Sequence, residues 1–294
     1  MEHLITRFAP SPTGRLHIGH AFSALFAYRK TMESDGTFIL RIEDIDLGRC
    51  RDEFIDGFYE DLSWLGITWA QPVRKQSDHF ETYAAYLDQL DDMGVLYPCF
   101  CTRKDIAAEI EGIGSAPHHI PTGPEGHHYP GTCRHLSAQE QQDKMDSGAP
   151  YALRLDIEKA IAVAGNNLTW TDQDKGKQIA TPAILGDVVL ARKDVKASYH
   201  LCVTIDDHLQ DISLVTRGSD LFYATHLHRL LQALLDLNVP EYCHHPLLLD
   251  EHGKRFAKRN NAVTLQHMRE QDGLSAAQVI AQIDSYEKSE HPVQ

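Results

Sequence analysis

The order of apolar and polar positions at the start of the chain predicts a strand, a loop, a helix and a second strand. The first strand is expected from His3 to Ala9, the helix from about Leu16 to Ser34 and the second strand from Phe38 to Ile42. The loop Pro10–Gly14 ends the first strand, because its prolines cannot donate hydrogen bonds to a strand ladder. A β-loop-α-β opening is typical of an α/β protein with a parallel sheet.

Further along the chain, the same patterns predict more helices and strands around one irregular stretch. Gly112–Thr132 contains repeated Gly, Pro and His without an apolar period, which predicts a long loop. We therefore expect two halves of one α/β domain, 1–97 and 149–240, an insertion at 98–148 and a short helical region at 241–294. The expected helices are 51–65 and 77–93 (ending at Gly66 and Gly94), Ser219–Leu237 with Ser219 as N-cap, 264–271 and 275–284, and the expected strands are Ala152–Leu155, Gly186–Arg192 and Ile212–Val215.

Composition and charge narrow the class of protein. Of the 294 residues, 42% are hydrophobic and 24% charged, which excludes a disordered or collagen-like chain. Apolar runs stay far below the ~20 residues that span a bilayer. The N-terminus has no basic segment followed by a long apolar one, so we expect a cytoplasmic protein without a membrane partner. The net charge of −14 argues against a general nucleic-acid binder but allows a local basic patch, and the 18 histidines are expected to respond to modest acidification.

The segment between the first strand and the first helix carries candidate chemistry. Nucleotides bind to α/β folds at the turn after a first parallel strand, where a helix N-terminus offers unpaired N–H groups and a partial positive charge. His17 and His20 are three residues apart and share one face of the first helical turn, and Gly19 leaves space between them. Two imidazoles at this place can donate hydrogen bonds to a phosphate that gathers charge in a transition state.

Four strings together make the chain similar to the glutamyl group of the class I aminoacyl-tRNA synthetases. They are Arg7-Phe-Ala-Pro-Ser-Pro-Thr-Gly14, His17-Ile-Gly-His20, Arg41-Ile-Glu-Asp-Ile-Asp46, and Tyr199-His-Leu with Asp206-Asp207-His208. The resemblance implies a Rossmann-like class I catalytic domain. It also implies a ligase in which a glutamate carboxylate attacks the α-phosphate of ATP, used with Mg²⁺, before a hydroxyl of RNA takes the acyl group.

The resemblance also implies roles for individual residues. It places Arg7 on the side-chain carboxylate of glutamate and Arg217 on the other carboxylate, since a guanidinium can hold a carboxylate with two hydrogen bonds. Glu43 matches the residue that holds the α-ammonium group. We leave Asp206 and Asp207 outside the predicted site, as residues that cap a helix or orient Arg217. The predicted glutamate-binding residues are Arg7, Phe8, Ala9, Pro10, Ser11, Glu43, Tyr199 and Arg217, and the predicted ATP-binding residues are His17, His20 and Lys258.

A second nucleotide-binding loop is expected after Leu247–Asp250. The KMSKS signature of the family aligns with Arg255-Phe-Ala-Lys-Arg259, in which Lys258 keeps the lysine that neutralises the ATP phosphates. Arg255 replaces the first lysine and Ala257 replaces the serine, so the charge is kept and one hydroxyl contact is lost. These departures bear on the rate and on the mobility of the loop more than on the reaction.

Cys99, Cys101 and Cys133 bracket the long loop, a pattern that suits a metal site better than a disulfide framework. Structural zinc takes four ligands. Zinc-bearing relatives place a tyrosine four residues before the last cysteine, so the resemblance implies Tyr129 as the fourth ligand. The zinc is then structural and pins an insertion that faces the RNA acceptor; reduced, metal-free cysteines are the alternative. Residue types alone would allow three other fourth ligands, His127, His128 and His135.

The region after the Lys258 loop is too short for the helical anticodon-binding domain of glutamyl-tRNA synthetases, so we expect that domain to be absent. In this respect the chain resembles the truncated glutamyl-Q tRNA(Asp) synthetases, which attach glutamate to the queuosine base at the wobble position of tRNA(Asp). Val203 stands where full-length glutamyl enzymes usually carry an asparagine, and it cannot make that polar contact. The expected acceptor is a hydroxyl of the queuosine cyclopentene ring, and the expected oligomeric state is a monomer.

Three other functions stay open at this point. A minimal glutamyl-tRNA synthetase would charge the 3′ end of tRNA. A non-catalytic tRNA- or nucleotide-binding module is supported only by the altered Arg255–Ala257 segment and is opposed by the intact site residues. An amino-acid-adenylating ligase with a small-molecule acceptor would keep ATP–pyrophosphate exchange without charging any RNA.

Overall fold

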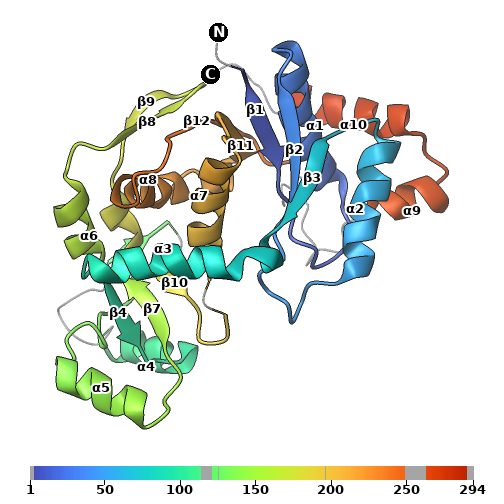
Figure 1. Cartoon of the computed structure of the whole chain (residues 1–294). Helices are drawn as coiled ribbons and strands as arrows, with labels where there is room; N and C mark the ends of the chain where they lie inside the picture. The colour runs from blue at the N-terminus through green and yellow to red at the C-terminus, as the bar shows by residue number, and fades with distance from the viewer. Residues whose placement is uncertain (1–2, 114–120, 125, 196, 249–262, 290–294) are drawn as a thin grey trace.

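The computed structural model describes residues 3–113, 121–124, 126–195, 197–248 and 263–289. Figure 1 shows an α/β body with two neighbouring sheet regions and a smaller lobe at one end, which holds α4 (Arg103–Ile113) and α5 (Ala138–Asp146). No described helix combines the length and the apolar character that a membrane span requires.

The first sheet region is parallel and has the strand order β1-β2-β3. α1 connects β1 to β2, as the β-loop-α-β pattern predicts. The helix ends at Glu33, and Gly36 lies between it and β2, where a Cβ would clash with the backbone oxygen of Leu4. The elements are β1 (Ile5–Phe8), α1 (Ile18–Glu33), β2 (Thr37–Ile42), α2 (Asp52–Trp64) and β3 (Ala70–Lys75).

The second sheet region has the order β11-β12-β8-β9, in which only β9 runs antiparallel. It joins the first region through β1 and β11. Ser213 N donates to Ile5 O (3.1 Å) and Arg7 Nη1 donates to Thr216 O (3.1 Å), so these strands run in the same direction side by side. The elements are β8 (Thr169–Asp172), β9 (Gly176–Ile179), α7 (Tyr199–Leu209), β11 (Leu214–Gly218), α8 (Ala224–Leu234) and β12 (Glu241–His245).

The smaller lobe is built on an antiparallel sheet with the order β10-β7-β4. α3 leads from β3 toward it, as the long horizontal helix in Figure 1 shows. The insertion expected at 98–148 contains α4, a two-stranded hairpin and α5. The remaining elements are η1 (Gln76–His79), α3 (Phe80–Asp92), β4 (Leu96–Cys99), β5 (Thr122–Gly123), β6 (Gly126–His127), β7 (Ala152–Leu155), α6 (Ile157–Ala164), η2 (Pro182–Leu185) and β10 (Val189–Ala191).

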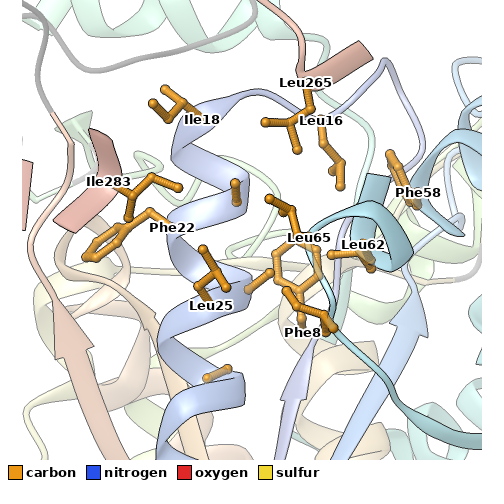
Figure 2. Close-up of a cluster of buried hydrophobic side chains, with 14 of the residues drawn as sticks. Phe8, Leu16, Ile18, Phe22, Leu25, Phe58, Leu62, Leu65, Leu265 and Ile283 are labelled. Atoms are coloured by element: carbon orange, nitrogen blue, oxygen red, sulfur yellow. The ribbon is translucent and has the colours of Figure 1, made fainter. Parts of the chain in front are cut away.

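A buried apolar cluster fixes α1 between the first sheet region and the C-terminal helices (Figure 2). Phe22 of α1 and Phe58 of α2 are buried in it, and so are Leu265 of α9 (Leu265–Glu270) and Ile283 of α10 (Ala276–Ser289). Truncating one such side chain to alanine costs about 2–5 kcal/mol. The cluster therefore sets the position of the α1 N-terminus relative to β1.

The structure corrects two of the sequence predictions and adds elements that were not predicted. The helix expected from Ser219 begins at Ala224, because Ser219–Leu221 forms a separate 3-10 turn in which Phe222 N donates to Ser219 O (3.1 Å). The stretch Gly112–Thr132 is not all loop, since it includes the end of α4 and the β5–β6 hairpin. The sequence analysis also left out several described elements, most of which are short or carry mostly polar residues: β3, β4, α4, β5, β6, α5, α6, β8, β9, α7 and β12.

Candidate active site

A cavity of about 830 Å³ opens where the carboxyl ends of β1 and β11 meet the N-terminus of α1. This is the place where open parallel sheets bind their ligands. Lys258, with Arg255 and Ala257, lies outside the described residues. All the other residues predicted to bind glutamate or ATP line this cavity: Arg7, Phe8, Ala9, Pro10, Ser11, His17, His20, Glu43, Tyr199 and Arg217.

His17 and His20 cap the first turn of α1. Gly19 N donates to His17 Nδ1 (3.1 Å), and His17 N donates to His20 Nδ1 (3.2 Å). These reciprocal hydrogen bonds form a capping box, with imidazoles in place of the usual hydroxyl and carboxylate. Because Nδ1 of each ring accepts a backbone proton, Nε2 of each neutral ring carries the ring proton and is a donor.

Arg7 is 5% exposed and is held by a carboxylate on α7. Asp207 accepts from Arg7 Nε (2.9 Å) and Nη2 (3.2 Å), and it also accepts from Arg41 Nη2 (2.8 Å). Burial would raise the pKa of Asp207, but the charges and hydrogen bonds of Arg7 and Arg41 outweigh it and lower the pKa. Asp207 therefore orients Arg7, whereas the sequence prediction considered a role on Arg217.

Glu43 follows β2, and its backbone N donates to Pro10 O (3.0 Å), which ties it to the end of β1. Its side chain is 11% exposed, and Arg41 Nη2 lies 3.5 Å from Glu43 Oε1. Burial raises the pKa of Glu43 to about 7, although the charges of Arg41 and Arg7 oppose this change. A buried carboxyl with a raised pKa gains from a cation, and the ammonium group of an amino acid is a suitable one.

Arg217 is 6% exposed and contacts a different set of partners. Nε donates to His244 Nε2 (3.2 Å), Nη1 lies 3.1 Å from His228 Nδ1, and Nη2 donates to Thr225 Oγ1 (2.5 Å). The guanidinium carbon also lies 5.4 Å from the ring centroid of Tyr242. All of these partners are neutral groups, so Arg217 keeps its charge for a ligand in the cavity.

The histidines near Arg217 do not respond to modest acidification, which corrects the expectation from the sequence. Burial and the charge of Arg217 lower the pKa of His200 to about 4, and burial with the same charge lowers the pKa of His244 to about 4. The pKa of His228 is lowered well below 6.5 for the same reasons. Composition alone does not report burial, and burial decides these pKa values.

Asp206, next to Asp207 on α7, has a structural role. It accepts from Arg74 Nε (2.7 Å), Gln76 Nε2 (2.8 Å) and the hydroxyl of Tyr83 (3.0 and 2.9 Å). These contacts join α7 to β3, η1 and α3. Sequence reasoning missed Arg41, Thr225, His228 and His244 as supports of the site, and their one common signal is a polar residue type at a position that the apolar pattern expects to be buried.

The three predicted cysteines meet in the smaller lobe. The sulfur atoms of Cys99, Cys101 and Cys133 lie within 4.8 Å of one another. The hydroxyl of Tyr129 lies 3.5 Å from Cys99 Sγ and 3.4 Å from Cys101 Sγ, and it accepts from Cys133 N (2.9 Å). Three thiols and a phenol at these distances could hold a metal ion.

Two of the alternative ligands contact other groups. His127 Nδ1 lies 3.1 Å from Thr122 Oγ1, and His128 Nε2 lies 2.8 Å from Ile184 O.

The guanidinium of Arg154 lies over the Tyr129 ring, 4.0 Å from its centroid, and so holds the tyrosine beside the thiols.

Comparison with known proteins shows the family to which this chain belongs. Residues 3–283 match the model of "tRNA synthetases class I (E and Q), catalytic domain". A glutamyl-Q tRNA(Asp) synthetase from Rhodobacter capsulatus is 44% identical over 94% of this chain and 98% of its own length. A glutamate–tRNA ligase from Hydrogenobaculum is 36% identical over 90% of this chain and 54% of its own length.

A solved structure of a glutamate–tRNA ligase from Elizabethkingia meningosepticum, in complex with its amino acid, has a TM-score of 0.71 at 28% identity. The match covers 88% of this chain and 52% of that one, so the chain spans about half the length of these glutamate–tRNA ligases. The chain is a ligase that belongs to the class I tRNA synthetase family of the glutamate (E) and glutamine (Q) type, within the group of the glutamyl-Q tRNA(Asp) synthetases.

Proposed function

We propose that this chain activates glutamate with ATP to glutamyl-adenylate and transfers the glutamyl group to the queuosine base at the wobble position of tRNA(Asp). The observation that carries the first step is the cavity, which combines two buried arginines of separate strands with one carboxyl whose side chain is 11% exposed. Glutamate has two carboxylates and one ammonium group, and these three charges match Arg7, Arg217 and Glu43.

In the proposed complex, Arg7 binds the side-chain carboxylate and Arg217 the α-carboxylate. The contacts of Arg7 with Asp207 and Thr216 use three of its five N–H groups, and the remaining two can hold a carboxylate. Glu43 binds the ammonium group and becomes ionised as it does so. Reversing any one of these charges would leave a buried charge unpaired, which gives the site its selectivity for glutamate.

ATP is proposed to bind with its phosphates at the α1 N-terminus. The Nε2–H groups of His17 and His20 are the proposed donors to the phosphate that gains charge as the α-carboxylate oxygen bonds to the α-phosphorus and pyrophosphate leaves. Mg²⁺ and Lys258 are proposed to neutralise the departing pyrophosphate. The protein's contribution is alignment and electrostatic stabilisation.

The acceptor is proposed from the relatives and from one residue. The Rhodobacter capsulatus relative matches this chain over 98% of its length and is named for tRNA(Asp). Val203, one turn after Tyr199 on α7, is 1% exposed and offers no polar atom where full-length glutamyl enzymes usually carry an asparagine. A hydroxyl of the cyclopentene ring would attack the adenylate carbonyl and release AMP.

The decisive experiment is charging with labelled glutamate and ATP of three acceptors: tRNA(Asp) with queuosine, the same tRNA without it, and tRNA(Glu). The proposal expects label on the first acceptor alone. Label on tRNA(Glu) would instead identify a minimal glutamate–tRNA ligase. Glutamate-dependent ATP–pyrophosphate exchange without any labelled RNA would point to a small-molecule acceptor. Absence of exchange would favour a non-catalytic tRNA- or nucleotide-binding module.

Cys99, Cys101, Tyr129 and Cys133 are proposed to hold a structural zinc ion. Zinc there would cross-link β4 to the segment before α5 and contribute directly to the folding of the insertion. Tyr129→Phe should lower zinc affinity by at least the roughly 10- to 100-fold that loss of an outer-shell partner costs. A competition titration with a chromogenic chelator measures this, with Cys50→Ser as a control outside the cluster. An unchanged affinity in Tyr129→Phe combined with a loss in His135→Asn would move the fourth ligand to His135.

A further inference from the structure

A line of buried side chains behind Arg217 connects it to a carboxylate on a different strand. Arg217 on β11 is in register with His244 on β12, and Asp172 ends β8, the next strand of the sheet. The side chains of His244 and Asp172 have no exposed surface, and neither residue is among the described residues that line the cavity. The line therefore supports the site from inside the protein.

Asp172 fixes the tautomer of His244. Asp172 Oδ2 lies 2.7 Å from His244 Nδ1, while Oδ1 accepts from the backbone N of Asp174 (3.0 Å) and Lys175 (2.9 Å). Burial would raise the pKa of Asp172, but its hydrogen bonds outweigh burial and lower the pKa, so the carboxylate is ionised and only accepts. His244 must then carry its proton on Nδ1, and its Nε2 lone pair faces the Nε–H of Arg217.

We propose that Asp172 and His244 are positioning residues for the amino-acid substrate, which aim the Arg217 guanidinium through an imidazole kept in its Nδ1–H form. In the other tautomer an N–H of His244 would face an N–H of Arg217 and displace it. An arginine binds a carboxylate through two parallel hydrogen bonds only when its plane is correctly turned, so a small rotation weakens binding. The inference rests on the proposed function, because it takes Arg217 as a ligand of glutamate.

The arrangement also keeps the positive charge of Arg217 available to the substrate. A carboxylate next to Arg217 would neutralise the charge that the substrate needs. The imidazole transmits the orientation from Asp172 across the sheet and remains neutral itself. Asp172 thus acts on Arg217 without forming an ion pair with it.

The test is Asp172→Asn, measured by glutamate-dependent ATP–pyrophosphate exchange. The new amide N–H would donate to His244 Nδ1 and force the proton onto Nε2. We expect the KM for glutamate to rise about 10- to 100-fold, the effect of losing one hydrogen bond to a charged group, with kcat and the KM for ATP little changed. Asp156→Asn, the same change at a buried N-cap outside the site, should leave the KM for glutamate unchanged.

A second variant separates positioning from general damage. In Asp172→Asn/His244→Gln the glutamine amide can turn its oxygen toward Arg217 without help from a carboxylate, so most of the lost glutamate affinity should return. If Asp172→Asn does not fold, as thermal unfolding would show, the comparison of His244→Gln with His244→Leu replaces it. Glutamine should then keep the KM near the wild-type value, and leucine should raise it.

Long-range ¹H–¹⁵N correlations of labelled histidine report the tautomer without any substrate. The wild type should show His244 protonated on Nδ1 and Asp172→Asn should show it protonated on Nε2. A folded Asp172→Asn with a wild-type KM for glutamate, or an equal loss of affinity in His244→Gln and His244→Leu, would overturn the inference. Failure of the proposed function is distinguishable, because the wild type itself would then show no glutamate-dependent exchange.

Discussion

Arg7 and Arg217 lie at the ends of neighbouring strands and face one cavity, yet the protein holds them in opposite ways. Arg7 shares the ionised carboxylate of Asp207 with Arg41, which also lies near Glu43 and Asp206, so Arg7 belongs to a buried ionic group. Arg217 is equally buried but is held by two imidazoles and a hydroxyl, all neutral. One arginine is fixed by charge and the other by neutral acceptors.

This difference shows how a site can hold two buried arginines in place and still bind two carboxylates. A buried guanidinium needs hydrogen-bond acceptors, because leaving its N–H groups unpaired is costly. Carboxylate acceptors stabilise the cation but reduce its pull on a ligand, whereas neutral acceptors satisfy the N–H groups and leave the charge available. We therefore expect the Arg7 group to matter more for folding and the Arg217 group more for glutamate affinity.

The largest expected effect is that of Asp207→Asn, which leaves Arg7 and Arg41 sharing a neutral amide. Breaking a buried ion pair from one side costs about 3–5 kcal/mol, so the free energy of unfolding in denaturant should fall by about that amount. Asp194→Asn, at an exposed pair with Arg192, is the matched control and should cost no more than about 1 kcal/mol. Equal effects of the two variants would contradict the ionic role of the Arg7 group.

Arg217→Gln should affect binding more than folding. Losing one partner of a buried, hydrogen-bonded charge pair costs about 2–5 kcal/mol of binding free energy, so the KM for glutamate should rise about 30-fold or more. The unfolding free energy should change less than in Asp207→Asn, because no carboxylate loses its partner. Arg192→Gln, at a half-buried arginine that does not line the cavity, serves as the control. A wild-type KM in Arg217→Gln would remove Arg217 from the substrate site.

The pH dependence of glutamate binding should follow Glu43, the carboxyl that lines the same cavity as the two arginines. Its pKa is raised to about 7, so the carboxyl is protonated below that pH and cannot pair with an ammonium group. The KM for glutamate should therefore rise as pH falls through 7, approaching tenfold per unit, while His200 and His244 stay neutral in this range. Exchange assays from about pH 5.5 to 8.5 measure this, and Glu43→Gln should raise the KM and flatten the profile.

The smallest expected effect is that of Thr225→Val, which removes one of the three neutral acceptors of Arg217 and keeps the side-chain shape. His244 and His228 remain in place, so the KM for glutamate should rise by about tenfold or less. Thr204→Val, at a buried hydroxyl of α7 that donates to His200 O, is the matched control. An effect as large as that of Arg217→Gln would mean that Thr225 contacts the substrate itself.

The fold class, the opening β-loop-α-β unit and most of the lining of the cavity could be predicted from the sequence. The apolar period located α1 and the strands on either side of it, and local motifs supplied the site residues at the ends of β1, β2 and β11. These predictions succeed because period, turn residues and motif are properties of neighbouring positions. The helix start at Ser219 failed for a local reason, since a tight 3-10 turn and a helical turn share the same residue preferences.

What the sequence by itself determined is the type of fold, the nucleotide turn, the candidate ligands of glutamate and the three cysteines. Only the tertiary structure decided how the site's charges are balanced. Asp207 meets Arg7 from 200 positions away and Asp172 meets His244 from 72 positions away, and no local pattern encodes such contacts. The pKa of each group depends on burial and on these distant partners. His244 is therefore neutral in the folded protein, although its residue type alone predicts that it would gain a proton on modest acidification.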